Sequence, residues 1–244
     1  MAIRAAPSVS QVAVGAPAVP PLENGDRLTR AEFERRYEAM PNVKKAELVE
    51  GVVYVGSPVR FLQHGRPDSD MQTWLGTYRV ATPGVESGGN STLRLDLDNE
   101  PQPDVLLRRA TGGSSTTDDD GYVQGAPEFV VEIAASSASY DLHDKLRAYR
   151  RNGVQEYLVW RVLDGELDWL VLRAGVYERL QPDDAGVIRS EVFPGLRLAV
   201  PALLAGDAAT VLATLQAGLA SPEHAAFVER LRATARQGAS REPA

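Results

Sequence analysis

The chain has 244 residues, of which 43% are hydrophobic and 24% charged. These are the proportions of a folded globular protein and exclude disorder over most of the chain. No apolar run approaches the roughly 18 residues of a membrane-spanning helix, so we expect no membrane partner. The sequence has no cysteine, which excludes disulfides, thiolate zinc sites and a cysteine nucleophile. The formal net charge of −7 excludes a general basic coat for nucleic acid but not a local basic face.

Residues 1–26 are expected to form a mobile N-terminal arm. The first 24 residues are rich in alanine, valine and proline, and Arg4 is the only early charge. The prolines interrupt the continuous apolar stretch that a secretory signal needs, so a cytoplasmic location is the default expectation.

The elements of the first half follow from local signals. Thr29-Arg30-Ala31-Glu32 is a capping box that opens a helix to about Met40, before Pro41. The run AELVEGVVYVGS predicts two short strands around a turn at Glu50-Gly51. A helical stretch around 60–80 follows. We then expect a polar-tipped hairpin over 84–97, a strand over 102–109 and an exposed loop over 111–126.

The second half begins with FVVEIA, residues 129–134, which is apolar almost throughout, as a strand covered on both faces would be. A helix is expected over 137–151, then two strands joined at Asp164-Gly165. Further short strands, a helix over about 201–217 and a last helix starting at Ser221-Pro222-Glu223 complete the chain. This order predicts one α/β domain over 27–205, with a C-terminal helical extension over 206–244.

Two carboxylates have unusual contexts. Asp104 follows a proline within the expected strand over 102–109, and Glu132 lies inside the apolar strand FVVEIA. Because burying an isolated ion is costly, Glu132 needs a partner. One interpretation pairs it with an arginine or a backbone group. The other has both acids converge from adjacent strands on a hard divalent cation.

Lys145 lies on the helix after the Glu132 strand. From there it would reach back over the strand end, or it would be a solvated lysine paired with Asp141 one turn away. Glu47, on the first hairpin, is by itself most simply an exposed acid. His64 is typical of a surface or helix-start residue, and the acids at 118–120 are typical of a solvated loop rather than a metal cluster.

In combination, these segments resemble one family. AELVEG with its hairpin, Pro58 and His64, QPDVLL, PEFVVEIA, DLHDKLRAYRRNGVQEYLVW and FPGLRL occur in the expected order over roughly residues 27–205. The chain is therefore similar to the Uma-type restriction-endonuclease family, a branch of the PD-(D/E)XK nuclease superfamily. The resemblance implies a restriction-endonuclease-like fold, a mixed β-sheet flanked by helices.

The resemblance also implies roles for individual residues. Asp104 and Glu132 would hold Mg²⁺ or Mn²⁺, with the backbone carbonyl of Ile133. Lys145 would position the attacking water or offset charge on the phosphate, and Glu47 would bind a second ion or orient Lys145. The superfamily commonly has a lysine two residues after the glutamate, and Ala134 stands there in this chain, so the helix supplies the lysine.

The leading hypothesis is thus a Mg²⁺-dependent endonuclease acting on DNA, with a homodimer favoured for cutting both strands. A second hypothesis is a non-catalytic binding or assembly module that kept the nuclease fold. A third is a metal-free hydrolase using the two acids as an acid–base pair. In the first case, DNA binding would depend on metal and on a local basic rim of Lys44, Lys45, Arg147, Arg150 and Arg151.

Overall fold

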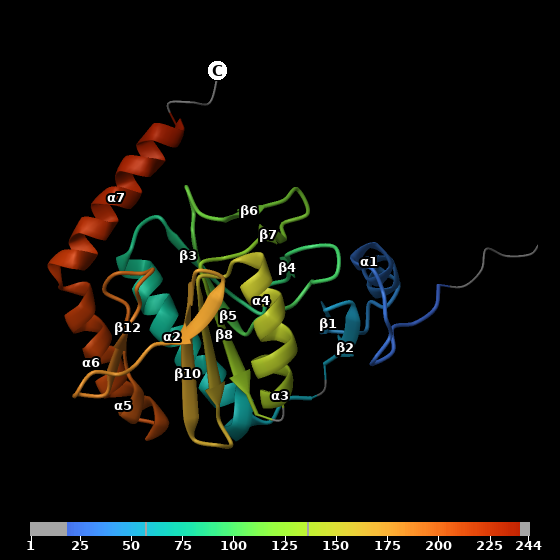
Figure 1. Cartoon of the computed structure of the whole chain (residues 1–244), viewed down its shortest axis with the longest axis horizontal. Coiled ribbons are helices and arrows are strands. Elements are labelled where there is room, and N and C mark those ends of the chain that lie inside the picture. The colour runs from blue at the N-terminus through green and yellow to red at the C-terminus, as the bar shows by residue number, and fades with distance from the viewer. Residues whose placement is uncertain (1–18, 57, 136, 240–244) are drawn as a thin grey trace, which may run out of the picture.

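A mixed β-sheet with helices on both faces forms the centre of the molecule (Figure 1). The computed structural model describes residues 19–56, 58–135 and 137–239. Within these residues the main sheet has six strands, in spatial order β11 (Val176–Arg179), β10 (Glu166–Arg173), β9 (Glu156–Arg161), β8 (Phe129–Ala134), β5 (Val105–Arg109) and β3 (Val85–Gly89). Strands β8 and β9 are parallel and their other neighbours antiparallel. This architecture confirms the predicted fold class.

The parallel pair needs a crossover, which the predicted helix after β8 supplies. It consists of α3 (Ala138–Tyr140), the π-helical turn η2 (Asp141–Lys145) and α4 (Leu146–Asn152). The helix ends at Gly153, whose φ of 86° is left-handed, as the Asn-Gly pair indicated. The hairpin around Asp164-Gly165 also forms as predicted, between β9 and β10.

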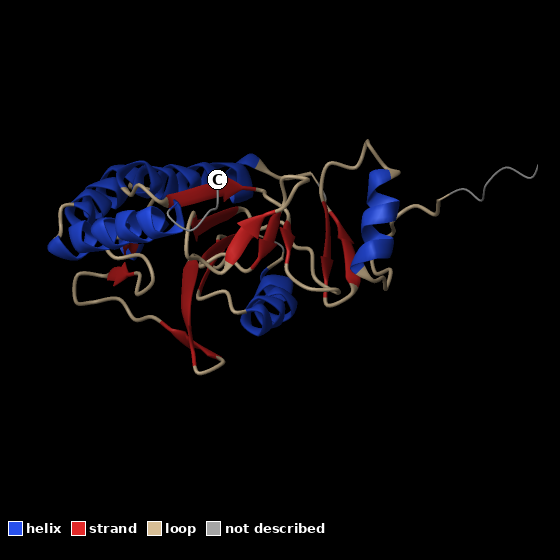
Figure 2. Cartoon of the chain, turned by 90° about the horizontal axis from the view of Figure 1, so that it is seen from above, coloured by secondary structure: helices blue, strands red, loops and turns tan. Residues whose placement is uncertain are grey.

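Strand alternation divides the side chains of β8 between two cores. Phe129, Val131 and Ile133 face α2 (Arg66–Ala81), where the Trp74 ring lies 6.4 Å from the Phe129 ring between centroids. The intervening residues of β8 share the opposite face with Tyr149 of α4. Seen from above, helices lie on both sides of the strands (Figure 2). Strand β8 is therefore covered on both faces, as its near-continuous apolar sequence predicted.

The N-terminal elements form a small layer beside the sheet. They are α1 (Arg30–Glu38), β1 (Ala46–Val49) and β2 (Val52–Val55), around a core that includes Phe33 and Leu48. The predicted hairpin turn is present, with φ of 53° at Glu50 and 72° at Gly51. Of the expected arm, residues 1–18 lie outside the described residues. Residues 19–26 lie against the hairpin, where the Gly25 amide donates to the Val53 carbonyl at 2.9 Å.

Two predictions for the middle of the chain were wrong. Residues 84–97 do not form a hairpin, because β3 pairs with β5 while β4 (Leu93–Arg94) pairs with β7 (Val123–Gly125). The expected loop over 111–126 contains β6 (Ser115–Thr117) and β7, which form a small sheet with β4. Arg94 anchors this sheet through an ion pair with Asp118 at 2.7 Å. Local pattern did not reveal the pairings of β3 with β5 and of β4 with β7, since each joins segments separated along the chain.

The C-terminal helices complete one face of the molecule. The helix expected over 201–217 is divided into α5 (Val200–Leu204) and α6 (Ala208–Leu219), with Gly206 between them at a φ of 74°. The last helix, α7 (Pro222–Ala239), begins as predicted, and the Ser221 hydroxyl accepts from the His224 amide at 3.3 Å. Leu215 and Leu231 from α6 and α7 join the α2 core. Within the described part of the chain, no helix is long and apolar enough to cross a membrane.

Candidate active site

A cavity of about 400 Å³ opens at the carboxyl end of β8. It lies between this strand end, the hairpin β1–β2 and a second π-helical turn, η1 (Phe61–Gly65), which precedes α2. Its charged and polar lining includes Lys45, Glu47, His64, Asp104, Glu132 and Lys145. All four predicted catalytic side chains thus meet in one open cavity, although they come from segments up to 98 positions apart in the printed sequence.

Strand geometry brings the two predicted metal ligands together. Glu132 belongs to the face of β8 that packs against α4, because it alternates with Val131 and Ile133 of the opposite core. Strand β5 pairs antiparallel with β8 through Val105 and Val131, and the next position along that register sets Asp104 opposite Glu132. The Ile133 amide donates to Asp104 Oδ2 at 2.7 Å and fixes the carboxylate at the strand end.

Lys145 is the central cation of the site. Its side chain is only 3% exposed, and its Nζ atom lies 2.9 Å from Glu47 Oε1, 3.0 Å from Glu132 Oε1 and 3.8 Å from Asp141 Oδ1. The pair with Asp141 exists, but the solvated lysine of the simpler interpretation does not. Instead, the helical segment after β8 places the Lys145 ammonium group beside Glu132, at the carboxyl end of β8.

The charges in this cluster shift one another's proton affinities. Burial alone would lower the pKa of Lys145, but the adjacent carboxylates of Glu132, Glu47 and Asp141 raise it well above its ordinary value. Burial raises the pKa of Glu132 and Asp141, and the Lys145 charge opposes that rise. The lysine therefore stays protonated and acts as a fixed positive charge.

Glu47 links the N-terminal layer to the sheet. It is 7% exposed, so it is not the exposed hairpin acid that its local sequence suggested. Besides contacting Lys145, Glu47 Oε1 accepts from the Gln102 amide at 2.7 Å, two residues before Asp104. Glu132 has a second buried partner, because the Tyr149 hydroxyl donates a hydrogen bond to Glu132 Oε1 at 2.8 Å.

His64 is the site residue that the sequence did not single out. Its Nε2 atom lies 3.2 Å from Asp104 Oδ1, and this proximity to Asp104 raises the pKa of the imidazole. The available signals were weak: His64 was one of the family-matching residues, and no metal-ligand spacing accompanied it. In the structure η1 carries His64 and η2 ends at Lys145, and π-helical turns recur at functional sites.

The oxygen atoms of the site fit a divalent metal ion. Asp104 Oδ1 is buried and accepts no well-oriented hydrogen bond from the described residues. Burial by itself would raise the pKa of Asp104, but His64, Lys45 and the Ile133 amide lower it, so the group is an anion. Both hydrogen bonds of Glu132 use Oε1, which leaves Oε2 for an ion.

No ready-made cluster of three or more metal-ligating side chains occurs among the described residues. This arrangement suits an ion such as Mg²⁺, which binds through one or two carboxylates and retains water or phosphate oxygens as its other ligands. Asp104 and Glu132 would be those carboxylates.

The arginines expected to form a basic rim are engaged in other contacts. Arg147 pairs with Asp144, and Arg151 pairs with Glu50 at 2.9 Å and with Asp96 at 3.2 Å. Arg150 donates to the Gly175 carbonyl at 3.3 Å. These acids reduce the positive field that the helix would otherwise present to a phosphate backbone.

Comparisons with known proteins agree with this fold. A crystal structure described as a putative nuclease belonging to DUF820 from Anabaena variabilis matches with a TM-score of 0.51 and 11% identity, over 70% of this chain and 96% of that chain. No curated protein matches. The Uma2 family model, described as "Putative restriction endonuclease", matches residues 30–201. Since that span is well over half of the chain and contains every residue of the cavity cluster, the protein belongs to the Uma2 family.

Proposed function

We propose that the protein is a metal-dependent endonuclease that hydrolyses DNA phosphodiester bonds, with Mg²⁺ or Mn²⁺ held by Asp104 and Glu132. The observation that carries this proposal is the buried Oδ1 of Asp104, which accepts no well-oriented hydrogen bond from the described residues and lies in the same open cavity as Glu132 and Lys145. When bound, the ion would polarise the scissile phosphate and lower the pKa of a water ligand. Membership of the Uma2 family supports a nuclease activity in general.

The protein's own groups have distinct roles in this proposal. Asp104 is held at the strand end by the Ile133 amide, and the Ile133 carbonyl is proposed as a further metal ligand. Lys145 is a poor general base because its neighbours keep it protonated, and it would instead stabilise negative charge that develops on the phosphate. Glu47 would hold Lys145 in place, through the 2.9 Å contact between them.

The finer points of the proposal concern location and assembly. We expect the enzyme to act in the cytoplasm. Two active sites in one assembly would cut both DNA strands in a single encounter, so a homodimer is favoured. Light scattering of the purified chain tests the dimer, and a monomer that still makes double-strand breaks in one encounter would contradict it.

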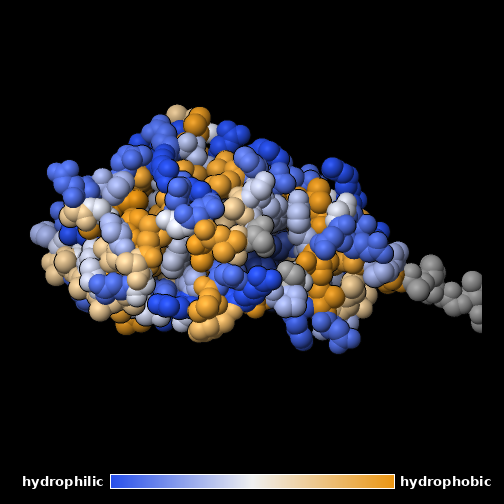
Figure 3. Space-filling view, turned by 90° about the horizontal axis from the view of Figure 1, so that it is seen from below, coloured by the Kyte–Doolittle hydropathy of each residue, from blue (hydrophilic) through white to orange (hydrophobic). Residues whose placement is uncertain are grey.

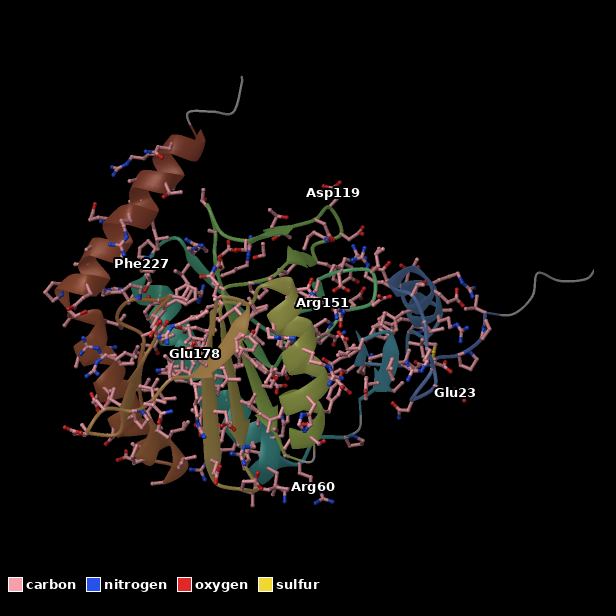
Figure 4. All side chains as sticks on the ribbon, in the orientation of Figure 1. Glu23, Arg60, Asp119, Arg151, Glu178 and Phe227 are labelled. Carbon is pink, nitrogen blue, oxygen red and sulfur yellow. The ribbon has the colours of Figure 1, made fainter. Side chains whose placement is uncertain are left out.

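Plasmid nicking tests the activity directly. Wild type should nick supercoiled plasmid in Mg²⁺ or Mn²⁺ and lose this activity in EDTA. Asp104→Ala and Lys145→Ala should be inactive. Asp119→Ala is the matched control, because Asp119 is an exposed acid at the upper end of the molecule, opposite the end that carries Arg60 (Figure 4). Equal nicking by wild type and Asp104→Ala would refute the proposal.

A non-catalytic binding module is the second candidate, favoured by one observation. Lys145 already neutralises part of the charge on Glu47 and Glu132, so the cluster is partly compensated without an ion. Calorimetric titration separates the two candidates. Binding of Mn²⁺ by wild type but not by Asp104→Ala supports the nuclease, and failure of Mg²⁺ and Mn²⁺ to bind at millimolar concentration supports the module.

A further inference from the structure

Exposed apolar side chains occur at the cavity and in the segment of η1 that adjoins its lining residues. Val59, Phe61 and Leu62 are 67%, 72% and 69% exposed, and Leu163 is 63% exposed. Val59 and Leu163 line the cavity itself, together with Arg60. We call these five residues, Val59, Arg60, Phe61, Leu62 and Leu163, the mouth patch. Viewed from below, this end of the molecule shows hydrophobic groups between hydrophilic ones (Figure 3).

Packing within the fold does not account for the apolar character of these exposed residues. Phe61 and Leu62 open η1, where no residue is buried, and Leu163 lies in the turn between β9 and β10. A single exposed apolar residue is ordinary. Here two segments about 100 positions apart in the sequence present such residues around the same opening, and grouped apolar exposure of this kind marks a binding surface.

The charges near the opening indicate what binds there. Arg161, at the end of β9, is paired with Asp164, Glu166 and Asp168. Arg60, in contrast, is exposed and makes no ion pair within the described part of the chain, and Figure 4 shows it at the lower edge. The other cavity cations, Lys45 and His64, lie beside Asp104 at 3.7 and 3.2 Å, so a strand at this opening meets few unpaired cations for its phosphates. Contacts to bases therefore have to add to its affinity.

We propose that the mouth patch binds unpaired bases, so that the preferred substrate is DNA with a single-stranded or locally opened segment at the cleavage site. Phe61 offers a ring on which a base stacks, and Val59, Leu62 and Leu163 contact apolar base faces. Arg60 lies between them in sequence and contacts a phosphate of the same strand. The inference rests on the proposed function for the presence of a DNA strand in the cavity.

The patch is suited to unpaired rather than paired DNA for a physical reason. In a duplex the base faces are covered by stacking, and apolar side chains reach them only by separating adjacent base pairs, which costs stacking free energy. An open segment presents those faces without that cost. A surface with one free arginine and four apolar residues therefore discriminates in favour of the open form.

Fluorescence anisotropy with labelled oligonucleotides tests the inference. The probes are a short single strand of mixed sequence and its duplex, in Ca²⁺, which takes the same oxygen ligands as Mg²⁺. Wild type should bind the single strand more tightly than the duplex. Phe61→Ala should weaken single-strand binding about tenfold, equivalent to about 1.4 kcal/mol, with little effect on the duplex. The control Leu97→Ala removes a side chain that is 74% exposed but lies beside Arg30 of α1 rather than in η1, and this variant should bind as wild type does.

Several results would overturn the inference. These are unchanged single-strand binding by Phe61→Ala, a preference of wild type for the duplex, no binding of either probe, or a Phe61→Ala variant that loses only self-association in light scattering. Thermal melting of Phe61→Ala should match wild type, because the substituted side chain is exposed.

Plasmid nicking in Mn²⁺ separates this inference from the proposed function. Nicking by wild type together with normal binding by Phe61→Ala would refute the mouth patch and leave the nuclease intact. Single-strand binding that depends on Phe61, without nicking by wild type, would support the patch and refute the nuclease.

Discussion

Removing the buried ammonium group of Lys145 should destabilise the protein in a strongly pH-dependent manner. The perturbation is Lys145→Met, which keeps the length of the side chain and deletes its charge. In wild type the Nζ atom lies within 4 Å of three carboxylates, those of Glu47, Glu132 and Asp141. Removing one partner of a buried ion pair typically costs about 3–5 kcal/mol, because the remaining charge is left uncompensated.

The pKa values set the direction and the pH range of this effect. Burial raises the pKa of Glu132 and Asp141 above their ordinary values of 4.5 and 3.8. A group with a raised folded pKa contributes stability below its unfolded pKa and loses it as the pH rises. Without Lys145, one further carboxyl of the cluster has to be protonated on folding. At 1.36 kcal/mol per pH unit above an ordinary pKa of 4.5 or 3.8, this costs roughly 5–6 kcal/mol at pH 8 and roughly 0.7–1.6 kcal/mol at pH 5.

Urea unfolding followed by circular dichroism at pH 5 and pH 8 measures this difference. The matched control is Lys45→Met at the same cavity. The Lys45 side chain is 31% exposed and 3.7 Å from Asp104, so its removal should cost less than about 1 kcal/mol at either pH. An equal loss of stability at both pH values for Lys145→Met, or a loss no larger than that of Lys45→Met, would refute the role of Lys145 as the counter-charge.

Three other substitutions probe buried hydroxyl and carboxyl groups. Tyr149→Phe removes the donor to the Glu132 carboxylate and should cost about 1.5–3 kcal/mol in urea unfolding, whereas Tyr177→Phe removes a bond to the neutral Val154 carbonyl and should cost about 0.5–1.5 kcal/mol. Equal losses would argue against a charged acceptor. Burial raises the pKa of Glu156 to about 7, so the stability that this group contributes below its ordinary pKa of 4.5 should be lost as the pH rises through 7. Glu156→Gln should remove this contribution. The difference in unfolding free energy between wild type and variant should change between pH 5 and pH 8, and a constant difference would contradict the shift.

Local sequence was sufficient for the elements that carry the proposed catalytic residues. The apolar run around Glu132 predicted a strand covered on both faces, and the hairpin before it was fixed by Glu50-Gly51. These predictions succeeded because strand alternation and turn geometry depend on residues close together in the chain. The position of Lys145 on the following helix could likewise be predicted from residues close to it in the chain.

The contacts made by these elements were harder to predict. Hydrophobic pattern indicates which face of a strand is buried but not which strand lies beside it, so the pairing of β3 with β5 was missed. Sequence pattern also does not show which distant segment a single polar residue will contact. His64 and Glu47 have ordinary surface sequence contexts, and their place beside Asp104 and Lys145 depends on how separate segments fold together.

The register between β5 and β8 connects catalysis to correct folding. Val105 lies opposite Val131, which sets Asp104 on the same face as Glu132. If β5 slipped by a single residue, its side chains would exchange faces, and the Asp104 carboxylate would point into the aromatic core around Trp74. Such a misassembled sheet would bury the Asp104 charge without a partner, and Asp104 and Glu132 would no longer face the same cavity. Folding errors in this strand pair would therefore yield inactive protein rather than an enzyme of altered specificity.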